Sequence, residues 1–108
     1  MALTRTFKDT IQARIRHDAP FRQALFQESI QAFLEGDAKT GREVLRDVIN
    51  ATTGFEALAE MTSTPAKSLM RMFGPNGNPT AGNLFGVIEA LQRAIGVRLL
   101  VSAAPVAA

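Results

Sequence analysis

The residues best suited to chemistry in this sequence lie in one short segment, Pro65 to Arg71, which reads PAKSLMR. Helical periodicity places Lys67, Ser68 and Arg71 on one face beside the small Ala66, and that face contains no acidic residue. Lysine and arginine can donate hydrogen bonds to guanine in the major groove of DNA, and serine can bind either a base or a phosphate. The segment therefore predicts a helix face that reads DNA, and a solvated basic helix face is the alternative interpretation.

A second set of polar side chains follows this segment. Residues 74–79 contain two glycines, two prolines and two asparagines, which disfavours helix and strand and predicts an ordered turn. Asn76 and Asn78 offer amides to a phosphate, Thr80 can cap the next helix, and Asn83 lies in its first turn. A turn that only repositions the last helix is an equally good interpretation. A P-loop is excluded, because no lysine follows the glycines at the required spacing.

Two short helices joined by a tight turn must position the basic face. Apolar spacing predicts a first helix over Phe55–Met61, and residues 62–64 break its pattern. Thr64 is expected to be the N-cap of the second helix, and Pro65 is expected at its first position, where no backbone donor is needed. This helix has an inward apolar side formed by Leu69, Met72 and Phe73. Such a pair, followed by a third helix, has the layout of a helix-turn-helix.

The sequence resembles the lambda-repressor-like (Xre) helix-turn-helix family. The residues that carry the resemblance are Leu58-Ala59-Glu60, a three-residue turn, Leu69-Met70-Arg71-Met72, and Gly77-Asn78-Pro79-Thr80 before an apolar helix. More narrowly, the chain is similar to HigA-type antidote proteins of addiction modules and to related prophage DNA-binding regulators. The resemblance covers residues 36–99. It implies a regulator that binds double-stranded DNA, represses its own operon and silences a small toxin of the RelE/ParE class.

Two positions depart from that family pattern. Phe55 stands where many members have a glutamine that touches a phosphate and braces the recognition helix, so that contact is expected either to be lost or to be replaced by core packing of Phe55. Ser63 stands in the turn where a glycine is frequent.

The first third of the chain lies outside the resemblance and is predicted to form a helical hairpin over residues 1–36. The first helix, residues 4–17, carries Phe7, Ile11 and Ile15 at four-residue spacing. A second helix starts near Pro20, ends at Gly36 and has inward apolar residues at Phe21, Leu25, Ile30, Phe33 and Leu34.

The helix-turn-helix domain is predicted over residues 37–101. Asp37 is expected to cap its first helix, which has inward residues Val44, Leu45, Val48 and Ile49 and outward residues Arg42, Glu43, Arg46 and Asp47. The last helix runs from Thr80 to Gly96, with inward residues Leu84, Phe85, Val87, Ile88, Leu91 and Ile95. Residues 97–101 are predicted to form a short strand that pairs with a second copy in a homodimer, and residues 102–108 to form a flexible tail.

The composition argues against several other classes of protein. The chain has 108 residues and a formal net charge of +2, no cysteine and a single histidine, His17, so neither a metal centre nor a catalytic site is predicted and no cofactor is expected. No apolar run is long enough to span a membrane or to act as a signal peptide, which favours a cytoplasmic location. Acidic residues outnumber basic ones over residues 28–60, a region that DNA is expected to avoid.

The sequence thus predicts an all-α, lambda-repressor-like helix-turn-helix protein that reads a palindromic operator as a dimer. A protein-interaction module that has lost specific DNA binding is the alternative function, and an enzyme is a distant third.

Overall fold

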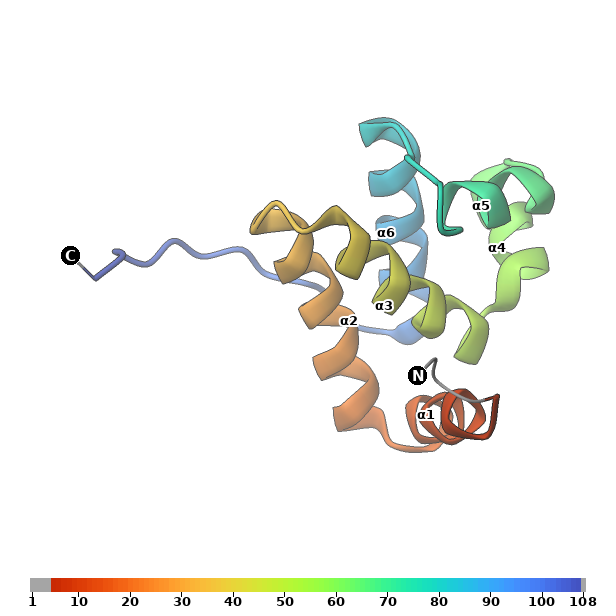
Figure 1. Ribbon diagram of the computed structural model, residues 1–108, viewed down its shortest axis with the longest axis horizontal. Coiled ribbons are helices and arrows are strands. Elements are labelled where there is room, and N and C mark those ends of the chain that lie inside the picture. Colours follow the sequence, from red (N-terminus) through yellow and green to blue (C-terminus); the bar gives the residue numbers. More distant parts are fainter. Residues whose placement is uncertain (1–4, 108) are drawn as a thin grey trace.

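The computed structural model describes residues 5–107 and contains six helices and no strand within that range (Figure 1). The helices are α1 (Arg5–His17), α2 (Ala19–Leu34), α3 (Ala38–Ala51), α4 (Gly54–Thr62), α5 (Ala66–Met72) and α6 (Ala81–Ile95). The predicted all-α class is confirmed. The expected start of the first helix at Thr4 and the last residue of the tail, Ala108, lie outside the described residues.

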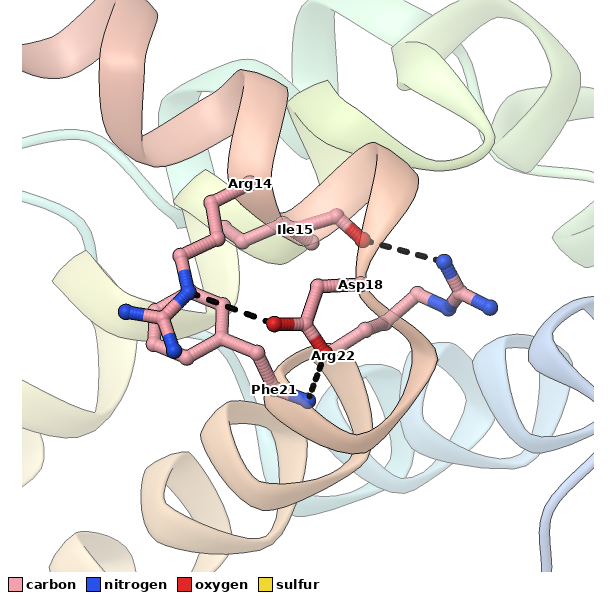
Figure 2. Close-up of polar contacts among 5 residues, drawn as sticks. All are labelled: Arg14, Ile15, Asp18, Phe21 and Arg22. Atoms are coloured by element: carbon pink, nitrogen blue, oxygen red, sulfur yellow. Dashed lines mark hydrogen bonds and ion pairs between the residues drawn. The ribbon is translucent and has the colours of Figure 1, made fainter.

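A single non-helical residue, Asp18, separates α1 from α2. Its carboxylate accepts hydrogen bonds from the Phe21 N–H at 3.0 Å and from the Arg14 Nε at 3.3 Å, and the Arg14 guanidinium lies 4.1 Å from the centre of the Phe21 ring (Figure 2). Arg22 donates to the carbonyl oxygen of Ile15 at 3.0 Å. Figure 1 shows α1 almost end-on while α2 lies in the plane of the view, so the two helices meet in a steep corner.

The predicted caps of α3 and α6 are confirmed. The Asp37 carboxylate accepts from the Thr40 N–H at 3.1 Å, and the Thr80 hydroxyl accepts from the Asn83 N–H at 3.2 Å. Gly96 ends α6 with a left-handed φ of 81°, which glycine adopts without steric cost.

One apolar core joins α2 to the four helices that follow it. Phe26 of α2, Leu45 of α3, Leu58 of α4, Leu69 of α5 and Leu91 of α6 belong to the same buried cluster, and each is at most 1% exposed. The most extensive contact between two helices is that of α2 with α3. The N-terminal helices are therefore packed into the body that holds α4 and α5.

The side chains that α2 buries agree with the predicted set only in part: Ile30 and Phe33 pack against the core as expected. Phe26 and Ser29 are fully buried, whereas Leu34 is 65% exposed. Ser29 tolerates burial because its hydroxyl donates to the Phe26 carbonyl oxygen at 2.6 Å. Apolar residues occur on every side of this helix, so its sequence did not single out one face.

The predicted inward face of α6 is correct except at one position. Val87, Ile88 and Leu91 are buried, but Phe85 is 65% exposed. The buried positions follow the three- and four-residue spacing of one helix stripe, and Phe85 lies outside it.

The C-terminal strand is absent from the described chain. The Leu99 N–H donates to the Gln92 side chain at 2.8 Å, and Leu99 packs against the core. Leu100 and Val101 are exposed, and the segment then leaves the body of the molecule (Figure 1). A strand needs a neighbour for its backbone groups, and residues 5–107 contain no second strand that could pair with residues 97–101.

Candidate nucleic-acid interface

The turn between α4 and α5 is built on Ser63. This residue has a φ of 55° and a ψ of 36°, and it is the single non-glycine residue with positive φ among residues 5–107. The Thr64 N–H reaches back to the Ala59 carbonyl oxygen at 3.2 Å and so closes the last turn of α4. The left-handed conformation that glycine usually provides is thus held by a serine.

The start of α5 differs from its predicted form. Thr64 does not cap the helix, because its hydroxyl is within 3.3 Å of the Thr62 carbonyl oxygen and the N-cap makes no side-chain hydrogen bond. Pro65 is itself the N-cap residue, with its carbonyl oxygen accepting from the Leu69 N–H at 3.1 Å, and the helix begins one residue later.

One side of α5 anchors the helix to the core. Leu69 and Phe73 are each 1% exposed, as predicted, and Met72 packs against the same cluster. Phe55 of α4, 9% exposed, belongs to this cluster too, so the predicted core packing at that position is confirmed. These contacts fix the direction in which the remaining side chains point.

The exposed side of α5 consists of Lys67, Met70 and Arg71, next to the exposed Pro65. Lys67 and Arg71 are one helical turn apart, which puts both cations on the same face. Ala66 and Ser68 were predicted on this face, but Ala66 packs against the core and Ser68 is half-buried. Met70, which the sequence placed in the core or at a dimer surface, is 49% exposed and directly precedes Arg71.

The loop between α5 and α6 presents its asparagines to solvent. Asn76 and Asn78 are exposed, as is Asn83 in the first turn of α6. The Thr80 hydroxyl already accepts a hydrogen bond from the Asn83 N–H. Gly77 is required here because a Cβ at this position would collide with the carbonyl oxygens of Met72 and Arg71. The loop is thus packed tightly against the end of α5.

The ten predicted DNA-binding residues therefore divide into three groups. Pro65, Lys67 and Arg71 share the exposed side of α5, and Asn76, Asn78, Thr80 and Asn83 form the exposed loop and helix start that follow it. The other three are less accessible: Thr64 lies in the turn before α5, and Ala66 and Ser68 lie on the partly buried side of this helix. Met70 was missed because an apolar side chain in a short helix gives no signal of exposure.

The described chain offers few other sites. His17 is exposed at the end of α1, and residues 5–107 contain no group of three His, Asp or Glu side chains that could hold a metal ion. None of the helices in the described range has the length and apolar character needed to cross a membrane.

Comparisons with protein-family models, with curated proteins and with solved structures found no match for this chain.

Proposed function

We propose that this chain is a sequence-specific DNA-binding regulator of the helix-turn-helix type, in which α5 enters the major groove. The observation that carries the proposal is the placement of Lys67 and Arg71. A short helix anchored by Leu69 and Phe73 presents two cations and no carboxylate to solvent, and it follows a tight turn from a second short helix. These are the features with which a recognition helix donates to base edges and phosphates.

The loop after α5 supports the proposal independently of the cations. Asn76 and Asn78 are exposed in the loop before α6, and Asn83 is exposed in its first turn, so their amides lie near a helix N-terminus, a place that suits a DNA phosphate beside the groove. Thr80 contributes by holding the first turn of α6 in place.

The dimer, the autoregulation and the toxin partner are the finer parts of the proposal. They derive from the resemblance to HigA-type antidotes and from the exposed apolar residues Leu100 and Val101, which a second copy can pair. A dimer would present two α5 helices to half-sites about 34 Å apart, so a palindromic operator upstream of the gene is expected.

The experiment titrates the protein into labelled DNA from upstream of its own gene, and binding is measured by fluorescence anisotropy at two salt concentrations. A scrambled duplex is the competitor. The double variant Lys67→Ala/Arg71→Ala should lose the preference for the upstream duplex, and its salt dependence should fall by about one unit of slope for each phosphate contact that is lost.

The matched control is Arg16→Ala/Arg98→Ala, which also removes two positive charges but from exposed positions near the C-terminal ends of α1 and α6. Retention of binding by this control and loss by the α5 variant would support the proposal. Equal loss in both variants would mean that only net charge matters and would refute recognition by α5.

A protein-interaction module is the second candidate function. The exposed Met70, directly before Arg71, favours it, because methionine adapts to protein surfaces. If neither duplex binds specifically, capture of the purified neighbouring gene product by wild type, but not by Met70→Ala, would select this alternative.

A further inference from the structure

A hollow of about 400 Å³ opens between α3 and the first residues of the α5–α6 loop. Its charged lining residues, which we call the α3 basic pocket, are Lys8, Lys39, Arg42, Glu43, Arg46 and Asp47. Phe73, Gly74 and Pro75 close the opposite side. Such a volume lies within the range of pockets that bind small ligands.

Three of the four cations of this pocket lie on one wall. Lys39, Arg42 and Arg46 are spaced by three and four residues along α3, so they project from the same face of that helix. Counting along the chain made residues 28–60 an acidic region, yet the fold gathers these three basic residues together. Sequence counting therefore missed the pocket.

The carboxylates of the pocket do not neutralise this wall. Asp47 is engaged by Lys8 of α1, whose Nζ lies 2.9 Å from its Oδ2, and Glu43 is exposed. No described residue forms an ion pair with Lys39, Arg42 or Arg46 within 4 Å. Three cations thus face the hollow while one of its two acids is already paired.

Arg42 carries the strongest indication of a ligand. Its side chain is partly buried, and its Nε is completely buried without a hydrogen-bond partner among the described residues. A buried donor without a partner is costly, so the position of Arg42 lowers stability. The terminal nitrogens of its guanidinium make no hydrogen bond within the described residues and are the donors left for a phosphate or carboxylate in the hollow. Phe73, which is 1% exposed, makes the floor apolar, and this would strengthen such a bond by excluding water.

We propose that the α3 basic pocket binds a phosphate group, with Arg42 as the central donor and Lys39 and Arg46 as flanking charges. The phosphate can belong to the DNA backbone, because the pocket adjoins the loop that leaves α5, or to a free phosphorylated ligand. The pocket would bind a free phosphate whether or not α5 reads DNA.

The test compares wild type with Arg42→Met, which keeps the aliphatic stem and removes the donors. Because the buried Nε has no partner, this variant should melt at or above the wild-type temperature when no anion is present. Inorganic phosphate and pyrophosphate are then titrated against wild type by calorimetry at constant ionic strength. Arg42→Met should weaken any such binding by roughly tenfold or more.

The second arm measures binding to upstream DNA. If the phosphate comes from the backbone, Arg42→Met should weaken binding to the upstream and scrambled duplexes alike and lower the salt slope by about one unit. Lys39→Met, an exposed position, should show a smaller effect in the same direction and covers the case in which Arg42→Met fails to fold. Arg98→Met is the charge-matched control outside the pocket.

Each result has one meaning. If the pocket variants lose binding of free phosphate and Arg98→Met does not, the ligand is a small phosphorylated molecule. If the pocket variants lose DNA affinity and Arg98→Met does not, the pocket binds a backbone phosphate. Absence of both effects, or equal losses in Arg98→Met, would overturn the proposal. Failure of α5 to bind DNA would leave the free-phosphate arm intact, so the two proposals fail separately.

Discussion

Replacement of Gly77 by alanine tests the packing between the end of α5 and the loop that leads to α6. The added Cβ would collide with the carbonyl oxygens of Met72 and Arg71, which are backbone atoms of the proposed recognition helix. Neither atom can rotate away, so the loop or the last turn of α5 has to move. Overpacking of this kind costs about 1–3 kcal/mol, and because about 1 kcal/mol corresponds to roughly 4–8 °C in a domain of this size, Tm should fall by about 10 °C.

Gly86→Ala is the matched control for this prediction. Gly86 lies in α6, it is exposed, and a Cβ there would meet no atom within 4 Å. The same chemical change should therefore raise stability by up to about 1 kcal/mol through helix propensity. Both substitutions restrict the unfolded chain equally, so the difference between them isolates the native-state collision.

The assay is thermal and urea unfolding followed by far-ultraviolet circular dichroism. Gly77→Ala should melt well below wild type and Gly86→Ala at or above it. A Gly77→Ala variant that melted as high as Gly86→Ala would refute the close packing of the loop against α5.

Three further predictions follow from local geometry. Ser63→Gly should raise the free energy of unfolding by about 0.5–1 kcal/mol in urea titrations, because glycine adopts the positive φ of this turn without strain, and an unchanged or lower value would contradict the left-handed turn. Gly41→Ala should lower the free energy of unfolding by about 1 kcal/mol, because the new Cβ would lie 2.7 Å from the Phe33 ring. Adding Phe33→Leu should recover part of this loss, whereas additive losses in the double variant would argue against the contact. The N–H of Phe21 holds the pKa of Asp18 below its ordinary value of 3.8, and the hydrogen bonds from Thr40 lower that of Asp37 in the same way. Because both pKa values are lowered in the folded state, the two carboxylates contribute fully to stability above pH 3.8, and this contribution is lost as the pH falls through 3.8 to the folded pKa values. Tm should therefore decline in acid less steeply for Asp18→Asn than for wild type.

The elements with strong end signals were predictable from the sequence. Asp37 and Thr80 cap their helices, and Gly96 ends the last one, because these residues act on the nearest turn of backbone and need no distant partner. The inward sides of α4 and α5 were predictable for a related reason. Phe55 and Leu58 are three residues apart in α4, so both lie on one face of that helix. Leu69 and Phe73 are four residues apart and share one face of α5 in the same way.

The features that depend on distant parts of the chain were not predictable in this way. Phe26 is buried in the shared core while Leu34 is exposed, and nothing within α2 indicates which of its apolar residues the other helices cover. The predicted strand is absent from this single chain, since pairing is a property of two segments. The cations of α3 share a pocket because residues at the start of the α5–α6 loop pack opposite them, and the α3 sequence does not indicate that contact.

The candidate DNA-binding face was predictable in outline and not in detail. The positions of Lys67 and Arg71 follow from helical period alone. Whether Ala66, Ser68 or Met70 shares their face depends on how α5 is rotated against the core, and that rotation is set by contacts with other helices.

The corner between α1 and α2 makes the two helix ends depend on each other. Asp18, which directly follows α1, caps α2, while Arg22 of α2 donates to the carbonyl oxygens of Ile15 and Arg16 at 3.0 and 3.1 Å. Unwinding the start of α2 would leave the last carbonyls of α1 without this donor, and loss of α1 would remove the Arg14 contact from the cap. The corner should therefore open as one cooperative unit, with the amides on both sides of Asp18 exchanging their hydrogens with solvent in the same event.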